Sequence, residues 1–345
     1  VVGHSYIVYG PLLAGATTIL FEGKPVGTPD AGAYWRLVAE HGVVAAFSAP
    51  TAIRAIKKLD PDAALLSDYD ISTLRTLFLA GERLDPDTWQ WATDALGIPV
   101  IDNWWQTETG WPITINPVGI GQLPIKPGSS GPATVGYDVQ VLDPSGQRVG
   151  PGVEGAICIK QPLPPGTLPT LWRDDQRYVD SYLSAFPGYY LTGDGGYVDE
   201  DGYLFIMGRT DDVLNVAGHR LSTGSIEEAL AGHPSVAECA VIGVRDALKG
   251  QVPRALVVLK AGVELDDAGV QGLRAELVQR VRSEVGAVAA LHRVDVVDAL
   301  PKTRSGKILR KTMRQIADGD QAQVPSTIED VAVLDALRGV LETEA

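Results

Sequence analysis

The chain has 345 residues and a formal net charge of −14, with 45% hydrophobic and 21% charged residues. This composition is that of a globular protein of two or three domains, and the acidity argues against nucleic-acid or anionic-membrane partners. No apolar run approaches the ~20 residues that a membrane-spanning helix needs, so we expect no membrane contact. The two cysteines, Cys158 and Cys239, predict no disulfide framework and a reducing compartment, the cytoplasm.

The first third of the chain predicts alternating strands and helices. Asp85 and Pro86 fit the N-cap and the first position of one helix. Because strands joined through single helices connect by right-handed crossovers, we expect a mostly parallel sheet of the α/β class, doubly wound in part. The other indicated elements are strands at 16–21, 43–47, 74–79 and 99–101, and helices at 31–41 and 50–59.

Two polar motifs follow strands of this predicted sheet. Ala80-Gly81-Glu82 comes after the strand at 74–79, and the run DNWWQTET at 102–109 comes after the strand at 99–101. Because open α/β sheets bind ligands at the carboxyl ends of their strands, both motifs are expected to line a pocket. There Thr107 offers a hydroxyl to a phosphate oxygen, and Glu108 offers a carboxylate of the kind that binds Mg²⁺ together with phosphates.

Residues 136–210 are rich in glycine, proline and short strands and predict a small β-subdomain. Within it, the TGD motif presents the carboxylate of Asp194 at a strand end, and a carboxylate suits the vicinal diol of a ribose. Asp201-Gly202 indicates a hairpin, and the cations Arg209 and Arg220 follow it. Two cations and a carboxylate so close together favour a phosphate ester with a sugar attached; the alternative is a surface ion-pair network.

After residue 211 the pattern predicts a compact α+β unit of about 115 residues. Ser225 and Glu228 fit a capping box for a helix that ends near Gly232. Strands are expected at 236–244, 254–260 and 294–300, and an amphipathic helix at 267–286. The unit ends in the basic run PKTRSGKILRKTMR, in which Lys307 has two interpretations. It lies either in a solvated helix start or on a mobile loop that brings a lysine to a developing negative charge.

The motifs WWQTETG, TGD, GRTDD, GHR and PKTRSGK occur in the order in which they occur in the AMP-forming acyl-CoA synthetases, the adenylate-forming enzymes, which the chain resembles. The resemblance implies that Asp194 and Arg209 hold the ribose and that Arg220 contacts the α-phosphate. It also implies that Lys307 catalyses adenylation, while Thr107 and Glu108 serve phosphate and magnesium. The residues implied to enclose the adenine are Gly81, Glu82, Asp102, Asn103, Trp104 and Gln106.

The resemblance further implies ATP, Mg²⁺ and coenzyme A as cofactors and a reaction in two steps. A carboxylate attacks the α-phosphorus of ATP to give an acyl adenylate and pyrophosphate, and the CoA thiolate then displaces AMP. Between the steps the small domain rotates about Asp211, while Gly218 borders the CoA tunnel and Arg282 contacts CoA. The implied division is a remainder of the AMP-binding large domain at 1–135, a β-rich subdomain at 136–210, a mobile α+β domain at 211–325 and a tail at 326–345.

The implied substrate is a small carboxylic acid. Trp105 would close the acyl pocket, where a rigid indole leaves room for few carbons. The stretches TETGWPI, PLPPG and DALKGQV resemble propionate–CoA ligases more than acetate–CoA ligases. One methylene contributes only about 0.8 kcal/mol on burial, so acetate stays an alternative to propionate. The oligomeric state and a regulatory acylation of Lys307 stay open.

The chain departs from the family in one respect, because it contains no Ser/Thr/Gly-rich phosphate loop. It also starts, at Val1, inside what the pattern indicates is an element. We therefore expect it to be the C-terminal portion of a longer enzyme. The contrasting hypothesis is a truncated, non-catalytic remnant that at most binds nucleotide. A missing part of the sheet predicts exposed apolar surface near residues 6–20 and 43–47.

Overall fold

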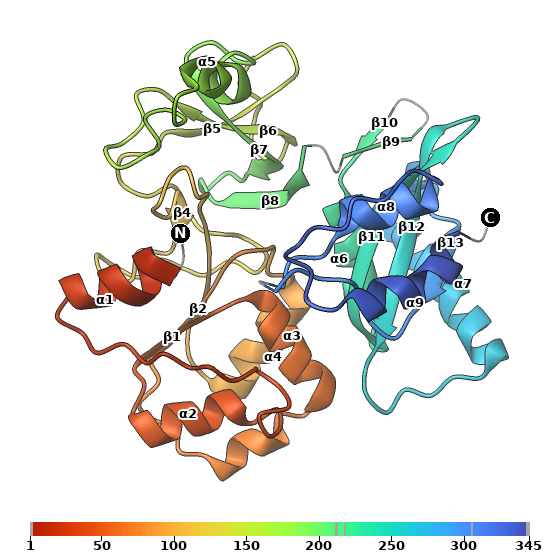
Figure 1. Ribbon diagram of the computed structural model, residues 1–345, viewed down its shortest axis with the longest axis horizontal. Coiled ribbons are helices and arrows are strands. Elements are labelled where there is room, and N and C mark those ends of the chain that lie inside the picture. Colours follow the sequence, from red (N-terminus) through yellow and green to blue (C-terminus); the bar gives the residue numbers. More distant parts are fainter. Residues whose placement is uncertain (1–2, 211–212, 217–218, 305, 343–345) are drawn as a thin grey trace.

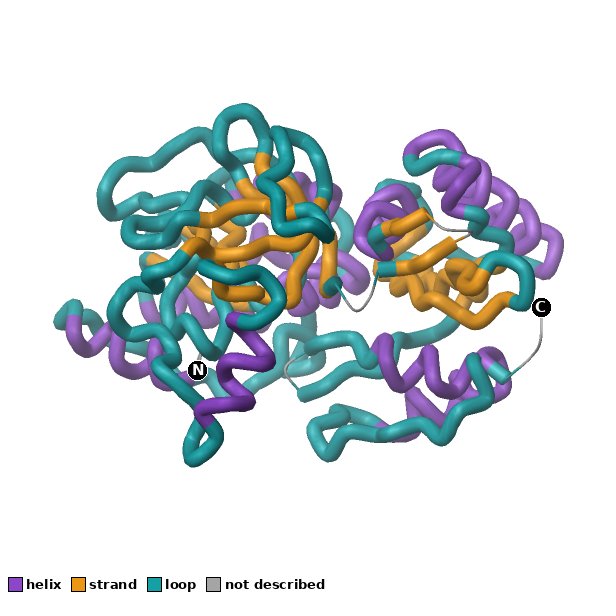
Figure 2. The backbone as a smooth tube through the Cα atoms, turned by 90° about the horizontal axis from the view of Figure 1, so that it is seen from above, coloured by secondary structure: helices purple, strands orange, loops and turns teal. Residues whose placement is uncertain are grey.

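Figure 1 shows a computed structural model in which three β-sheets are distributed over two lobes. The structure describes residues 3–210, 213–216, 219–304 and 306–342, with the side chains of all but residues 3, 4, 215, 219 and 220. Residues up to 210 form the large lobe, and the residues that follow form the small lobe. Figure 2 shows the two lobes side by side from a second direction.

The first sheet of the large lobe is mostly parallel, as the sequence predicts. Its order is β1 (Ala45–Ser48), β2 (Thr76–Leu79), β3 (Val100–Trp104) and β4 (Thr114–Ile115), of which only β4 runs antiparallel to its neighbour. The helices between these strands are α2 (Ala33–His41), α3 (Pro50–Leu59), the 3₁₀ helix η2 (Ala64–Asp68) and α4 (Pro86–Leu96). Since β3 runs on to Trp104, residues 102–104 lie within the strand and not after it.

Local chemistry sets the ends and faces of these helices. The Asp85 carboxylate accepts a hydrogen bond from the Thr88 amide at 2.8 Å, so Asp85 caps α4 as predicted, and Pro86 is its first residue. Gly97 ends α4 in the left-handed conformation, with φ at 63°. The apolar side of α3 presents Ile53 and Ile56, both fully buried, to the core of this lobe.

The strand predicted at residues 16–21 does not form. The described chain instead opens with two short helices, η1 (Gly3–Tyr9) and α1 (Gly10–Leu13), and continues as a loop. β-branched residues make a strand only where a neighbouring strand offers hydrogen bonds, and residues 16–21 pair with none of the described strands. Apolar side chains are exposed in the regions that the sequence indicates, including Leu13, Leu20 and Val44.

A second, antiparallel sheet forms a β-subdomain above the first. Its strands are β5 (Val139–Leu142), β6 (Gly155–Lys160), β7 (Tyr189–Val198) and β8 (Leu204–Arg209), in that order. The TGD motif lies inside β7 and not at a strand end, because β7 bulges at Gly195/Gly196 and continues. At Gly196 a Cβ atom would lie 2.0 Å from the Phe205 carbonyl oxygen, so only glycine fits there. The short helices α5 (Asp175–Tyr178) and η3 (Val179–Leu183) precede β7, and η3 packs against it.

The small lobe is a sheet with helices on both faces. Its strands follow the order β10 (His219–Leu221), β9 (Leu214–Val216), β12 (Gly250–Leu259) and β11 (Val236–Asp246), and β13 (Arg293–Val296) adds parallel to β12. Its helices are α6 (Thr223–Ala231), α7 (Asp267–Glu284), the 3₁₀ helix η4 (Ala287–Ala289), α8 (Arg310–Ala317) and α9 (Val331–Leu341). Ser222, and not Ser225, caps α6, because its hydroxyl accepts from the Gly224 amide at 3.1 Å.

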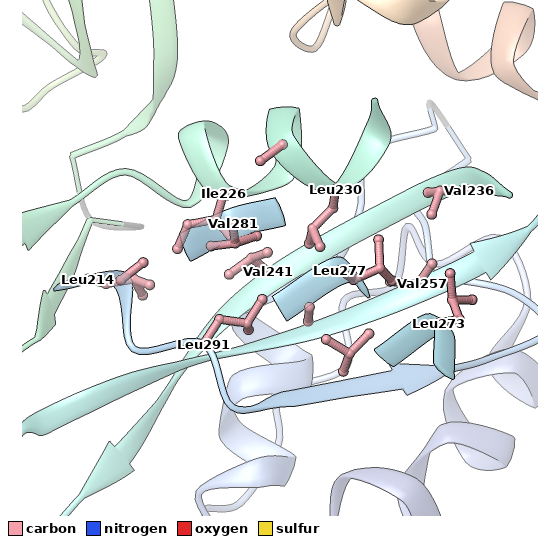
Figure 3. Packing of buried hydrophobic residues seen from close by; sticks show 14 of the residues in the cluster. Leu214, Ile226, Leu230, Val236, Val241, Val257, Leu273, Leu277, Val281 and Leu291 are labelled. Atoms are coloured by element: carbon pink, nitrogen blue, oxygen red, sulfur yellow. The ribbon is translucent and has the colours of Figure 1, made fainter. Parts of the chain in front are cut away.

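Neighbouring residues of β11 bury their side chains in two separate cores. Val241 packs with Leu277 of α7 and with α6, as Figure 3 shows, whereas Ala240 and Ile242 pack with α8 and α9. Arg254 holds the end of α9 from within the sheet, since it pairs with Asp295 at 2.8 Å and donates to the Leu341 carbonyl oxygen. No helix of the described chain is long and apolar enough to cross a membrane.

We expect the substitution Leu277→Ala to lower the free energy of unfolding of the small lobe by roughly 2–5 kcal/mol, because it opens a cavity in a fully buried site. Chemical denaturation monitored by circular dichroism measures the change. Leu248→Ala is the matched control, since Leu248 is 95% exposed and its truncation should stay within about 0.5 kcal/mol. Equal effects of the two substitutions would contradict the assigned core.

Candidate active site

A cavity of about 1030 Å³ lies between the two lobes and is lined by both. The large lobe contributes the ends of β1 and β3, the segment after β2 and parts of β7 and β8, and the small lobe contributes α6, the start of β11 and the segment before α8. Most of the side chains predicted to bind nucleotide meet here. The predicted residues that line the cavity are Gly81, Glu82, Asp102, Asn103, Trp104, Trp105, Gln106, Thr107, Glu108, Asp194, Arg209 and Lys307.

The other four predicted residues are not among the described residues that line this cavity. Asp211 and Gly218 lie outside the described residues, as does the side chain of Arg220. Arg282 lies exposed on α7 and is not among the residues that line the cavity. The roles expected for these four residues therefore stay predictions.

Asp194 is the centre of a polar network on the floor of the cavity. Gln106 Nε2 donates to one carboxylate oxygen at 2.9 Å, and Arg209 Nη1 donates to the other at 3.4 Å. Gln106 is itself oriented by the Tyr190 hydroxyl, which donates to Gln106 Oε1 at 3.0 Å. Burial raises the pKa of Asp194, and the nearby Arg209 guanidinium opposes that rise. The result is a nearly buried carboxylate with fixed orientation.

Gly193 makes the approach of Arg209 possible. Its φ of +73° belongs to the left-handed region, and a Cβ atom there would lie 2.6 Å from Arg209 Nη2. A side chain at this position would therefore push the guanidinium away from the Asp194 carboxylate. The glycine of the TGD motif therefore admits a cation beside Asp194.

Glu108 has a partner that the sequence did not indicate. The Tyr182 hydroxyl donates to Glu108 Oε1 at 2.9 Å, and the ring of Tyr182 stacks on Tyr190 with centroids 5.3 Å apart. The short helical segment η3 delivers Tyr182 to the site. The two partners are 74 positions apart in the sequence, and no spacing signal could have revealed the contact.

Glu82 is held by the large lobe before any ligand enters. Arg54 Nη2 lies 2.6 Å from its carboxylate, and the Thr51 hydroxyl also donates to it. Arg54 bridges further to Asp85 at 3.2 Å, so one buried guanidinium joins α3 to the segment before α4. Burial raises the pKa of Glu82, and the charge of Arg54 acts in the opposite sense. The carboxylate beside the expected adenine site is thus fixed by a cation that the sequence did not single out.

Trp105 belongs to an aromatic cluster with Tyr6 and Phe47. The rings of Trp105 and Tyr6 are stacked with centroids 4.7 Å apart, and Phe47 lies 5.9 Å from Trp105. Phe47 and Trp105 both line the cavity. The cluster joins three segments that are far apart in the sequence and closes one side of the space with large rigid rings.

The loop that carries Lys307 is docked against the large lobe. The Thr51 hydroxyl shares its single proton between Glu82 and the Gly306 carbonyl oxygen, which lies 3.3 Å away, and the Lys307 amide donates to Thr303 Oγ1 at 3.1 Å. Within the described part of the chain, no carboxylate pairs with the Lys307 ammonium group within 4.0 Å. A second contact between the lobes joins Arg83 to Glu228 at 2.5 Å, although the sequence suggested no role for Arg83.

The residues present fit a magnesium ion that arrives with a nucleotide. Among the described residues, no group of three or more His, Cys, Asp or Glu could hold a metal by itself. Mg²⁺ is commonly bound through one or two carboxylates with the remaining ligands from phosphates and water. Glu108 supplies such a carboxylate, and its bond to Tyr182 occupies Oε1 and leaves Oε2 for the ion.

Comparison with known proteins identifies relatives over nearly the whole chain. A family model described as "AMP-binding enzyme" matches residues 1–168, and one described as "AMP-binding enzyme C-terminal domain" matches residues 225–307. The mouse "Acyl-CoA synthetase short-chain family member 3, mitochondrial" is 51% identical over 99% of this chain and 50% of its own length. The "Propionate--CoA ligase" of Escherichia coli is 48% identical over 99% of this chain and 54% of its own length.

A solved structure supports the same relationship at the level of the fold. The anthranilate CoA ligase AuaEII in complex with anthranoyl-AMP superposes with a TM-score of 0.74 at 28% identity, over 87% of this chain and 54% of that one. This similarity confirms the predicted α/β fold class. The chain spans about half the length of the curated relatives that it matches.

We expect Asp194→Asn to raise the melting temperature at pH 7. A carboxyl group whose pKa is raised by folding destabilises the folded state above its unfolded pKa of about 3.9, and the asparagine amide has no such cost. The difference in melting temperature between the variant and the parent should shrink as the pH falls and vanish below about pH 3.9. Thermal denaturation at several pH values measures it, with Asp62→Asn at an exposed position as the control. A variant less stable than the parent at pH 7 would contradict the assigned cost of burial.

Proposed function

The chain belongs to the family of AMP-binding enzymes, and we propose that it ligates a short-chain carboxylic acid, preferably propionate, to coenzyme A. The reaction proceeds through an acyl adenylate and releases AMP and pyrophosphate from ATP. One observation carries the proposal: Lys307 from the small lobe and Asp194, Thr107 and Glu108 from the large lobe line a single cavity. Two lobes that converge in this way enclose the phosphates of one nucleotide.

The nucleotide is proposed to lie with its ribose on Asp194. The oriented carboxylate accepts hydrogen bonds from the two ribose hydroxyls, and Arg209 reaches the ribose and the phosphate beside it. The adenine lies between Gly81 and Glu82 on one side and the segment 102–106 on the other. Because Arg54 holds Glu82 and Tyr190 holds Gln106, both walls are ordered without the ligand.

The first chemical step joins two anions, so it requires cations at the α-phosphate. Lys307 is suited to this task because its ammonium group borders the cavity and is not neutralised by a carboxylate of the described chain. Thr107 donates a hydroxyl to a phosphate oxygen, and Arg220 is proposed to contact the α-phosphate by resemblance to the family. Magnesium, when bound with ATP at Glu108, would neutralise phosphate charge.

The acid is proposed to lie against Trp105. The stacked rings of Trp105, Tyr6 and Phe47 restrict the depth of this part of the cavity and favour a short aliphatic chain. Similarity to a relative named propionate–CoA ligase supports propionate over acetate. The second step, attack of the CoA thiolate, requires Lys307 to leave; rotation about Asp211, a CoA path beside Gly218 and a contact with Arg282 are proposed for it.

A nucleotide-binding protein without catalysis is the competing function. The two hypotheses differ in turnover, since only the enzyme forms AMP in a manner that depends on both acid and CoA. AMP formation with propionate, acetate and butyrate, measured beside equilibrium binding of AMP, separates them. Binding without turnover favours the competing function, and the absence of both overturns the proposal. Free thiols at Cys158 and Cys239 support a reducing site of action such as the cytoplasm.

We expect Lys307→Ala to abolish adenylate formation while thioester formation from supplied propionyl adenylate stays near the parental rate, because the lysine acts only on the first step. The loss should amount to at least about 100-fold, the range for removing one group that stabilises a developing charge. Pyrophosphate release and CoA consumption measure the two steps. Lys311→Ala, at an exposed position of α8, is the matched control. Equal loss of both steps in the Lys307 variant would refute the division of labour.

We expect Trp105→Gly to extend the range of accepted acids to butyrate and longer chains. Each methylene that then becomes buried contributes about 0.8 kcal/mol, or roughly a fourfold gain in kcat/KM per added carbon. Initial rates with a series of straight-chain acids measure the effect. Trp111→Gly, at an exposed tryptophan outside the cavity, serves as the control and should leave the series unchanged. An unaltered acid profile in the Trp105 variant would remove this residue from the acyl pocket.

A further inference from the structure

Two stacked tyrosines hold the cavity segment that contains Gln106 and Glu108. Tyr182 and Tyr190 lie almost parallel, with an interplanar angle of 5° and centroids 5.3 Å apart. The Tyr182 hydroxyl donates to Glu108 Oε1 at 2.9 Å, and the Tyr190 hydroxyl donates to Gln106 Oε1 at 3.0 Å. Each tyrosine therefore holds one side chain of the segment. Glu108 belongs to the proposed metal site, and Gln106 belongs to the proposed ribose site beside Asp194.

The stacked tyrosines are anchored in the buried core of the β-subdomain. Tyr190 is 1% exposed and belongs to a buried cluster with Ile113 and Ile159, against which Tyr182 also packs. The backbone of Glu108 is anchored as well, since the Leu168 amide donates to its carbonyl oxygen at 2.6 Å. With the backbone held, the remaining freedom of Glu108 is rotation about its side-chain bonds, and the hydrogen bond from the Tyr182 hydroxyl restricts that rotation.

A tyrosine suits this task better than a cation. Its hydroxyl orients a carboxylate through one hydrogen bond but leaves the negative charge in place to attract a metal, whereas lysine or arginine would neutralise it. On the other side of the stack, Gln106, which Tyr190 orients, donates a hydrogen bond to the Asp194 carboxylate at 2.9 Å and so restricts its orientation as well.

We propose that Tyr182 is a positioning residue that orients Glu108 toward the magnesium ion of bound ATP. Through its stack on Tyr190 it ties the geometry of the metal site to that of the ribose site. The inference rests on the proposed function and deepens it by naming the group that sets metal affinity. It predicts that the hydroxyl of Tyr182 matters for the metal-bearing ligand alone.

Titration calorimetry on the purified protein tests this without turnover. Tyr182→Phe keeps the ring and its stack but removes the hydroxyl. The affinity for ATP in the presence of magnesium should fall roughly 10- to 100-fold, the range for loss of a partner that orients a metal ligand. The affinities for AMP and for ATP with a chelator should stay at the parental values. The magnesium concentration at half-saturation should rise by the same factor as the affinity falls.

Tyr189→Phe is the matched control. It removes a hydroxyl that donates to Gln140 at 3.0 Å on the same subdomain, away from the cavity, and should alter none of the affinities. In a Glu108→Gln background, the further change Tyr182→Phe should cause no additional loss, because the carboxylate that it orients is gone.

Two outcomes would overturn the inference and are distinct from each other. A fall of equal size with and without magnesium would mean that the hydroxyl supports only the fold, while the proposed function would stand. A parental protein that binds neither AMP nor ATP would overturn the proposed function, and the role of Tyr182 with it. A selective loss of the magnesium-dependent part would support both.

Discussion

The docking of the lysine loop against the large lobe is the contact on which the site depends. Gly306 receives a hydrogen bond from Thr51 of α3, and the Arg83–Glu228 pair holds α6 to the same lobe. Neither contact is strong by itself, because a neutral hydrogen bond contributes about 1 kcal/mol and a partly exposed ion pair about 0–1 kcal/mol. Their weakness suits a lobe that is proposed to rotate between two steps, since an interface that must open cannot be a sealed apolar core.

The charges of the cavity are divided between structure and proposed chemistry. Arg54, Arg83 and Arg310 each pair with a carboxylate from another segment of the chain. Their positive charges therefore mainly neutralise neighbouring acidic side chains. Lys307 has no such partner among the described carboxylates and can act on an anion that enters. In a chain with a net charge of −14, the proposed entry of ATP therefore depends on a local cation that no described carboxylate neutralises, and not on the overall charge.

Pre-organisation extends from the core of the β-subdomain into the site. Tyr190 is buried among apolar residues yet orients Gln106, and Tyr182 is stacked on it and orients Glu108. The same packing that stabilises the subdomain thus fixes two polar side chains before a ligand binds, which lowers the entropy lost on binding. In this region, residues of the folded core also orient the side chains that are proposed to bind the nucleotide.

Local rules were enough to predict most of the elements of this protein, but not all of them. Helix α3, the Asp85 cap and the parallel pairing of β1 to β3 follow from periodicity, capping chemistry and connection length, all of which act within a few residues. The strand expected at 16–21 failed because β-propensity needs a partner strand, and the bulge that keeps TGD inside β7 depends on the neighbouring β8. Tyr182 on Glu108 and Thr51 on Gly306 were decided only by the tertiary structure, since partners 74 and 255 residues apart meet through the packing of whole lobes.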